Sequence, residues 1–291
     1  MRDYLKSFFE EFDFDKSDSE FLIAAYDKIA SNENALNKWN AILEAYDNDI
    51  LLDYTETVIN GAKAIGDSLS IHPYTSSFLI FACMSRRLRI LYEENGIDLQ
   101  IYRESMPDMK WKLEECKAVK GIVGSSVVTW FPGFFRLKRF GFGRLQFEVV
   151  NIRYDYSKNG VVLKKDESKV INVHIPRSGT PIDKESCDLA YAKAREFFKD
   201  EVGENCPFVC YSWLLFPENK NILSPESNTY RFMSEYDIIE WGYNLGEDLW
   251  RLFDTEDKNP YRLPTNGSFR RRYVEHLKNG GRVGWGYGVK L

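Results

Sequence analysis

The sequence lacks a hydrophobic stretch long enough to form a membrane helix. Its 291 residues contain no apolar run of about 18 residues, the length that a helix needs to cross a bilayer. The longest apolar candidate, residues 78–84, is much shorter. The first residues also lack the basic start and the apolar centre of a signal peptide. We therefore expect a cytoplasmic protein with no membrane partner.

Paired cysteines and histidine clusters are also missing. The chain has 3 histidines and 5 cysteines, and the cysteines stand at positions 83, 116, 187, 206 and 210. Only Cys206 and Cys210 are close in sequence, and on an extended strand they lie roughly 13 Å apart. Scattered cysteines among apolar residues are typical of buried thiols in a reducing compartment. We expect neither a metal site nor a local disulfide.

The chain has no excess of basic residues. Its formal net charge is -5, whereas nucleic-acid binding calls for a basic face. The densest basic stretch is Arg270, Arg271 and Arg272. Three successive side chains on a helix face different directions, so we interpret this stretch as a solvated face. We expect no nucleic-acid partner.

Apolar spacing divides the chain into two parts. A chain of this length with 44% hydrophobic residues favours two domains over one large core. In the front half, apolar residues recur at helical spacing, as at positions 35, 36, 39, 42, 43 and 46. Asp18-Ser19 and Pro73 are predicted starts of two helices. From Gly121 the composition shifts toward Gly, Ser, Val, Trp, Phe and Pro, which favours strands. We predict a helical domain over residues 1–130 and a second domain over residues 131–291.

Alternating polar and apolar residues predict strands early in the second domain. Gln146 and Glu148 alternate with apolar neighbours, and so do Asn172 and His174. Residues 161–163 begin another predicted strand after a Ser-Lys-Asn-Gly turn, so that three strands form a meander. The polar sides of the strands that carry Gln146, Glu148 and His174 then share one surface of the sheet. We predict that this surface is the floor of a site.

Helices and strands alternate in the rest of the chain. We expect a loop at 177–183 with a helix after it, a buried strand at 208–216, a short helix starting at 224–227, strands at 236–243 and 282–290, and a helix at 268–278. The last strand alternates glycine with large residues. Glycine in a strand permits the close approach of another backbone or of a ligand.

Four sequence motifs follow one another in fixed order between residues 141 and 233. They are Gly-Arg-Leu-Gln-Phe-Glu at 143–148, His-Ile-Pro at 174–176, Ser-Trp-Leu-Leu at 212–215 and Ser-Asn at 227–228. Their order and spacing resemble a family of two-domain bacterial acyltransferase-like proteins, in which an all-helical domain precedes a GNAT-like N-acyltransferase domain. The resemblance covers nearly the whole chain. It implies an α+β fold, with a helical N-terminal domain followed by a mixed α/β domain.

The resemblance further implies an acyl-CoA site where two neighbouring parallel strands splay apart. A helix start offers unpaired N–H donors and a positive dipole end, which favour the CoA pyrophosphate. The matching loop is Ser178-Gly179-Thr180, and Ser212 is a further candidate cofactor contact. The loop departs from the family pattern of an Arg or Gln followed by two spaced glycines, and Asp183 would repel phosphate unless it caps the helix. An ordinary strand-to-helix turn is the other interpretation.

Acyl transfer to an amine needs a base, and an acid can protonate the leaving thiolate. Glu148 and His174 are the candidate bases, because histidine titrates near neutrality and burial can raise a glutamate into the same range. Tyr230 stands where many GNAT enzymes place a tyrosine acid. Gln146 and Asn228 are candidate contacts to the acceptor, for which the resemblance implies a small amine. A histidine bonded to a strand neighbour and an asparagine bracing a helix are the structural alternatives.

Two non-catalytic alternatives remain open. Aromatic residues make up 15% of the chain, and Trp130, Phe131, Phe134 and Phe135 could form a platform that binds sugar or peptide. Exposure of these rings would favour that platform. The second alternative is an acyl-CoA sensor that binds the cofactor without a positioned base.

Overall fold

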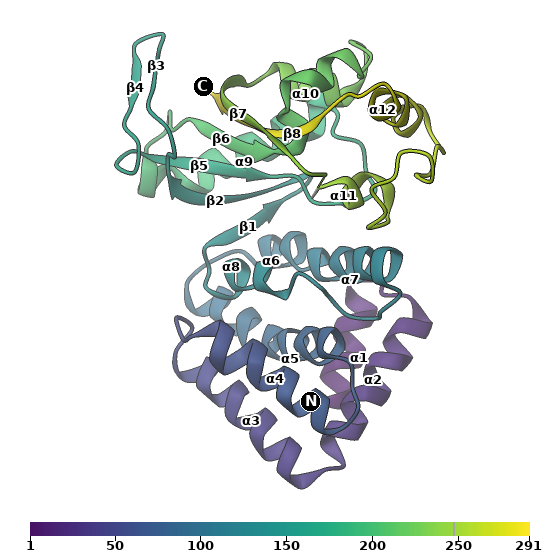
Figure 1. Ribbon diagram of the computed structural model, residues 1–291. Helices are drawn as coiled ribbons and strands as arrows, with labels where there is room; N and C mark the ends of the chain where they lie inside the picture. The colour runs from purple at the N-terminus through teal and green to yellow at the C-terminus, as the bar shows by residue number, and fades with distance from the viewer. Residues whose placement is uncertain (247) are drawn as a thin grey trace. The chain divides into compact units, whose positions relative to one another are not determined.

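The computed structural model describes every residue of the chain except Glu247 (Figure 1). It divides into two compact units, Met1–Phe140 and Gly141–Leu291. The first unit is helical, and the second combines a mixed sheet with helices. This confirms the expected α+β class.

The first unit consists of helices around a central buried one, α5 (Figure 1). In chain order they are α1 (Arg2–Glu11), α2 (Lys16–Ala30), α3 (Glu33–Asn48), η1 (Tyr54–Asn60), α4 (Gly61–Ser68), α5 (Pro73–Glu94), α6 (Leu99–Ser105), α7 (Pro107–Lys120), η2 (Val128–Trp130) and α8 (Pro132–Phe135). Pro73 begins α5 as predicted, because the first helical turn needs no N–H from that position. By contrast, α2 begins at Lys16, so Asp18 and Ser19 lie within the helix and do not cap it.

Aromatic rings fill the core where η2 and α8 meet α5. Phe131, Phe134 and Phe135 are at most 1% exposed. The Phe81 ring centroid lies 5.3 Å from that of Phe131 and 5.0 Å from that of Phe135. These rings are core, so the exposed platform considered above is wrong for them. Their packing also carries the first unit to Phe140, beyond residue 130 where the composition suggested a boundary.

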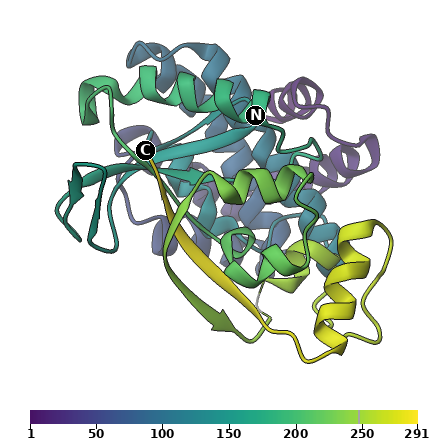
Figure 2. The ribbon, with the colours of Figure 1, turned by 90° about the horizontal axis from the view of Figure 1, so that it is seen from above.

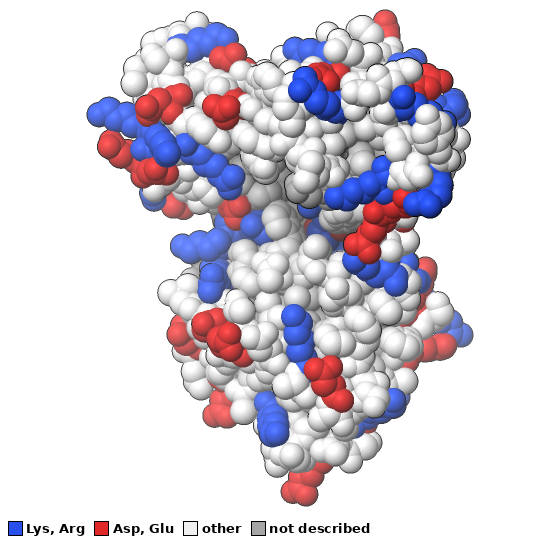
Figure 3. Space-filling model, viewed as in Figure 1, with Lys and Arg blue, Asp and Glu red and all other residues white. Residues whose placement is uncertain are grey.

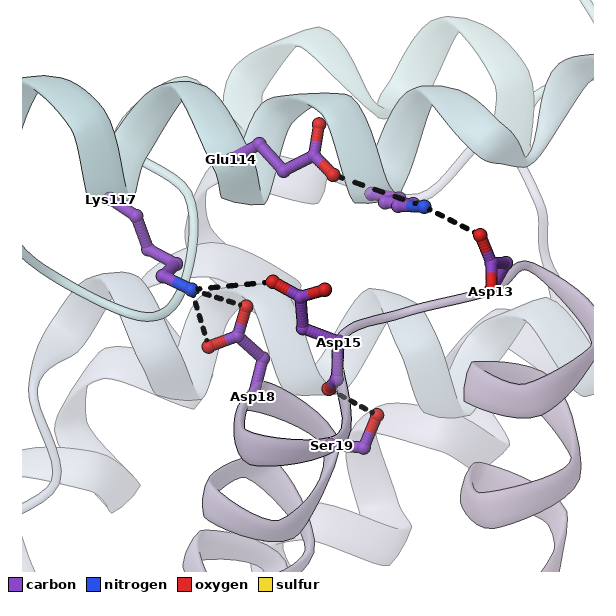
Figure 4. Close-up of polar contacts among 7 residues, drawn as sticks. Asp13, Asp15, Asp18, Ser19, Glu114 and Lys117 are labelled. Carbon is purple, nitrogen blue, oxygen red and sulfur yellow. Dashed lines mark hydrogen bonds and ion pairs between the residues drawn. The ribbon is translucent and has the colours of Figure 1, made fainter.

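A buried carboxylate joins α2 to α7 (Figure 4). The Asp18 side chain is 5% exposed, and its two oxygens accept hydrogen bonds from Lys117 Nζ at 2.7 Å and 2.6 Å. The Asp15 carboxylate lies 4.0 Å from the same ammonium group. A buried carboxylate is tolerated when it is paired and hydrogen-bonded. Asp18 therefore forms an ion pair between α2 and α7 and does not cap its own helix.

The second unit contains a six-stranded sheet of order β1-β2-β5-β6-β8-β7 and a separate two-stranded ribbon, β3-β4. The strands are β1 (Arg139–Phe142), β2 (Leu145–Asn151), β3 (Tyr156–Lys158), β4 (Val161–Leu163), β5 (Lys169–His174), β6 (Phe208–Ser212), β7 (Asp237–Asn244) and β8 (Val283–Lys290). The expected three-stranded meander is wrong, because β2 pairs directly with β5 and the ribbon β3-β4 forms a sheet of its own (Figure 1). Asn159 and Gly160 form the ribbon turn with φ of 52° and 79°, as expected of an Asn-Gly hairpin.

Different elements cover the two faces of the sheet. Helix α9 (Lys184–Val202) packs on one face, where the Tyr191 ring lies 4.8 Å from Phe208 and 5.9 Å from Phe147. Side chains alternate along a strand, so Gln146 and Glu148 lie on the other face. The ribbon covers one end of that face through a core of Ile152, Tyr156, Leu163, Val170, Val209, Tyr287 and Val289. The polar end of the face carries the candidate site.

The buried strand expected at 208–216 ends early. Strand β6 stops at Ser212, and η3 (Trp213–Leu215) turns back over β8. A Cβ atom on Gly286 would collide with the Leu215 carbonyl oxygen, and one on Gly288 would lie 2.8 Å from Tyr236 Cβ. Gly286 of β8 thus permits the close approach of the η3 backbone. The sequence predicted that these glycines permit the approach of another backbone or of a ligand.

The remaining helices complete the second unit. They are η4 (Pro217–Asn221), α10 (Asn228–Ser234), α11 (Leu249–Phe253) and α12 (Ser268–Lys278). Figure 2 shows α9 and the yellow α12 at opposite sides of this unit. The predicted strands at 236–243 and 282–290 and the helix at 268–278 are confirmed.

The surface is mixed in charge, and Figure 3 shows Lys and Arg interspersed with Asp and Glu over the visible face. Among the residues with described positions, no helix has the length and apolar character needed to cross a membrane.

Replacing Lys117 by Met leaves the Asp18 carboxylate buried without its cation. We expect the free energy of unfolding to fall by about 2 kcal/mol, the typical cost of leaving a buried charged group unpaired. Urea denaturation measures the change. Lys16→Met is the matched control, because the Lys16–Glu20 pair is largely exposed and its loss should leave stability unchanged. Equal effects in both variants would contradict this account of Asp18.

Candidate active site

Strands β2 and β5 bring two of the predicted site residues together. In their antiparallel register Gln146 faces His174, and Glu148 faces Asn172. His174 Nε2 lies 2.7 Å from Glu148 Oε1, and Asn172 Nδ2 donates to the same oxygen at 3.2 Å. The side chains of His174 and Glu148 are 20% and 16% exposed. The predicted shared polar surface is therefore present, and solvent reaches it.

The hydrogen bonds are consistent with one arrangement of protons. A carboxylate only accepts hydrogen bonds, so His174 Nε2–H and the Asn172 amide both donate to Glu148 Oε1. In the neutral imidazole this assignment places the lone pair on Nδ1. Asn172 Nδ2 also lies 3.1 Å from His174 Nε2. With both nitrogens donating to Glu148, this approach is not itself a hydrogen bond, and the shared acceptor Oε1 holds the three groups together. Such a cluster can hold an imidazole in the orientation of a general base.

Gln146 occupies a more buried position than a substrate contact requires. Its side chain faces His174 across the two strands and is only 1% exposed. Directly opposed side chains on neighbouring strands lie in contact range. Gln146 therefore forms the floor beside the imidazole.

The parallel strands β5 and β6 part beside this cluster. Their register pairs Ile171 with Phe208 and Asn172 with Val209, after which β5 continues to His174 and β6 to Ser212. His174 thus lies past the last pair, at the edge of the gap. An end of pairing before the end of both strands is what the splayed arrangement implied by the resemblance requires.

Arg144 holds the loop that follows β5. Its guanidinium donates to the carbonyl oxygens of Thr180 at 3.1 Å, Pro181 at 3.0 Å and Pro176 at 3.0 Å. Burial lowers the pKa of Arg144 from its usual value. The Nε–H, shared between two carbonyls, and one Nη1–H thus bind three carbonyl oxygens of the loop, so the loop conformation depends on this partly buried side chain.

The loop itself is a tight turn into α9. Gly179 has φ of 77°, and the hydroxyls of Ser178 and Thr180 lie 2.7 Å apart. Asp183 caps the helix by accepting from the Ser186 backbone N–H at 2.9 Å. The backbone N–H and the hydroxyl of Ser186 lower the pKa of the Asp183 carboxyl. The Asp183 side chain thus caps the helix, which is the orientation that a nearby phosphate would require. Its carboxyl group nevertheless stays negatively charged and would repel the phosphate.

Ser212 and two helix residues lie elsewhere around the gap. Ser212 Oγ accepts from Leu214 N at 3.1 Å and starts η3, so Ser212 stands at a strand end and not within the strand. Ser227 caps α10 through Tyr230 N, which makes Asn228 the first helical residue rather than the cap. Helix α10 contacts α9 and η3, so Tyr230 belongs to the face opposite Glu148. Tyr230 and the Glu148–His174 pair thus lie on opposite faces of the sheet.

Asn172 and Arg144 were absent from the predicted site. Asn172 was identified only as a polar strand residue, although its two-residue spacing from His174 places both on one face. The contact of Arg144 with a loop more than thirty residues later follows from tertiary structure, and we know of no local signal for it. Within the described part of the chain, no group of His, Cys, Asp and Glu residues is arranged to hold a metal ion.

Two protein-family models match the chain. The N-acyltransferase N-terminal domain matches residues 3–137, and the GNAT-like C-terminal domain matches residues 139–290. Among curated proteins, none matches the sequence.

Solved structures of acyltransferases share the fold. One in complex with decanoyl-CoA has a TM-score of 0.73 at 18% identity. A mutant acyltransferase in complex with octanoyl-CoA has a TM-score of 0.74 at 19% identity, and an acyltransferase in complex with decanoyl-CoA and teicoplanin has 0.73 at 20%. Each alignment covers 98% of this chain and 86% of the other. The likeness extends over both units.

Replacing Arg144 by Met removes the donors that hold the loop after β5. We expect a loss of about 2 kcal/mol in the free energy of unfolding and faster amide hydrogen exchange over residues 176–181. Arg195→Met is the control, because Arg195 donates to the carbonyl oxygens of Glu204 and Cys206 at the other end of α9. It should loosen residues 203–206 and leave residues 176–181 protected. Unchanged exchange at 176–181 in Arg144→Met would contradict the role of Arg144.

Proposed function

Because the chain belongs to the family that joins an N-acyltransferase N-terminal domain to a GNAT-like C-terminal domain, we propose that it transfers an acyl group from acyl-CoA to a small amine. The observation that carries the proposal is the Glu148–His174 pair beside the gap between β5 and β6. His174 of this pair is the proposed base, and the thioester is proposed to bind beside it, between β5 and β6. The solved relatives hold octanoyl-CoA or decanoyl-CoA, which supports a medium-chain acyl donor.

In the proposed reaction the amine nitrogen bonds to the thioester carbonyl carbon, and the C–S bond breaks. His174 takes the proton from the amine, and Glu148 orients the ring and stabilises the imidazolium that forms. Tyr230 approaches from the α9 side and protonates the leaving thiolate. The products are an amide and free CoA, and His174 returns its proton to solvent or to the tyrosine. Asn228, on the same helix as Tyr230, is the proposed contact for the acceptor.

The donor site lies at the start of α9. We assign the pyrophosphate to Ser178, Gly179 and Thr180, because this loop leads directly into the helix start and Arg144 fixes its conformation. Ser212 stands at the end of β6 beside the same gap, where its hydroxyl can reach the pantetheine arm. Two charges near this helix start are unfavourable to CoA, those of Asp183 at the cap and Glu185 in the first turn.

We also propose a cytoplasmic location, which the acyl-CoA donor and the free cysteines support. Acyl-CoA is an intracellular donor, and all five cysteines are free and buried. Free thiols are typical of a reducing compartment.

Turnover of octanoyl-CoA with a panel of amines tests the proposal. We expect His174→Gln to lower kcat by roughly 10²–10⁴-fold, because the base is lost. The control is His276→Gln, whose ring lies 2.9 Å from the Arg282 carbonyl oxygen on another part of the unit. Binding of octanoyl-CoA without turnover in the unmodified protein would instead favour the acyl-CoA sensor.

Asp183→Asn removes the negative charge beside the proposed pyrophosphate site. Asparagine can accept the same backbone hydrogen bond, so the helix start should be kept, with a small loss of stability because Ser186 favours the charged form of Asp183. Octanoyl-CoA should bind severalfold more tightly at low salt. Calorimetric titration measures the affinity. Asp188→Asn, which removes a surface carboxylate paired with Lys184, should leave the affinity as it was. Unchanged affinity in Asp183→Asn would place the pyrophosphate elsewhere.

A further inference from the structure

An aromatic stack occupies the same sheet face as the Glu148–His174 pair. Val209 pairs with Asn172, and Tyr211 follows two residues later on β6, so Tyr211 lies on the His174 side of the sheet. It stands across the gap from His174. The Trp285 ring centroid on β8 lies 5.1 Å from that of Tyr211. Tyr211 is 46% exposed, which leaves much of its ring in reach of a ligand.

Arg153 continues this stack from a third segment. Its guanidinium carbon lies 5.3 Å from the Tyr211 ring centroid. Its backbone N–H donates to Tyr287 Oη at 3.3 Å, and Tyr287 is the partner of Tyr211 in the β6–β8 ladder. The backbone of Arg153 is thus anchored on the face that carries the candidate base.

The charge of Arg153 is not neutralised by a neighbour. Some other arginines of this unit pair with carboxylates, as Arg177 does with Asp254 and Arg282 with Glu218. Within the part of the chain that the structure describes, Arg153 forms no ion pair with a carboxylate. An exposed guanidinium that is stacked on a ring and lacks a carboxylate is suited to bind an anion from solution.

On the basis of the proposed transferase function, we infer that Arg153, Tyr211 and Trp285 select an acceptor that carries both an aromatic ring and a carboxylate. The ring packs against Tyr211 and Trp285, the carboxylate binds Arg153, and the amine faces His174. Neighbouring strands lie about 4.8 Å apart, so a molecule of amino-acid size can bridge from β5 to the Tyr211 stack. The acceptor class is then an aromatic amino acid or a short peptide with an aromatic residue.

Steady-state kinetics with octanoyl-CoA and two acceptors test this inference. Phenylalanine has the ring and the carboxylate, and 2-phenylethylamine has the ring alone. Arg153→Met should raise KM for phenylalanine about tenfold, the effect of one charge-assisted hydrogen bond, and leave KM for 2-phenylethylamine and octanoyl-CoA unchanged. Tyr211→Leu should raise KM for both acceptors. Arg251→Met is the matched control, because Arg251 also stacks on a ring, at 4.4 Å from Trp250, but lies on α11.

Two outcomes would overturn the inference without touching the transferase. A higher KM for octanoyl-CoA in Arg153→Met would assign the guanidinium to a CoA phosphate. Equal use of both acceptors by the unmodified protein would remove the carboxylate from recognition. A calorimetric titration of the octanoyl-CoA complex with phenylalanine decides the case in which no amine turns over. Binding that weakens in Arg153→Met supports the inference, and absence of binding overturns it.

Discussion

Strands β5 and β6 form the pairs Ile171–Phe208 and Asn172–Val209 and then part, and the candidate site depends on this parting. On one side, β6 ends at Ser212 because η3 turns over the glycines of β8, where a Cβ atom on Gly286 would collide with Leu215. On the other side, Arg144 holds the loop after β5. Each strand is therefore directed away from the other by its own set of contacts.

The two faces of the sheet give the gap two different approaches. Helix α9 and its start lie on one face, together with Ser212 and α10. The ribbon buries one end of the other face and leaves the end that carries the Glu148–His174 pair and the Tyr211 stack. In the proposed enzyme the CoA donor comes from the side of the helix start, and the acceptor comes from the side of the imidazole. Separate approaches let both substrates be bound when the amine attacks.

Local pattern was enough to predict much of this site. The alternation around Glu148 and His174 placed both on one sheet face, and the antiparallel register then brought them to 2.7 Å. The helical front half, the Pro73 start and the last two strands follow the same kind of periodicity. The resemblance added the splayed strands, which no single segment encodes.

The errors arose where tertiary contacts overrode local preference. Asp18 has the chemistry of a cap, but Lys117 draws it into an ion pair. An apolar run through Phe216 suggests a longer β6, but the glycines of a strand seventy residues later accept η3 instead. The rings of Phe131 and Phe135 gave no local sign of burial, since their partners Phe81 and α5 lie far back in the sequence.

Calorimetric titration of the purified protein with octanoyl-CoA tests the central claim most directly, because both the donor site and the chemistry presuppose that the gap binds an acyl thioester. The account predicts saturable binding at micromolar concentration, and weaker binding when Arg144 no longer fixes the loop. No binding of octanoyl-CoA, decanoyl-CoA or acetyl-CoA would contradict it.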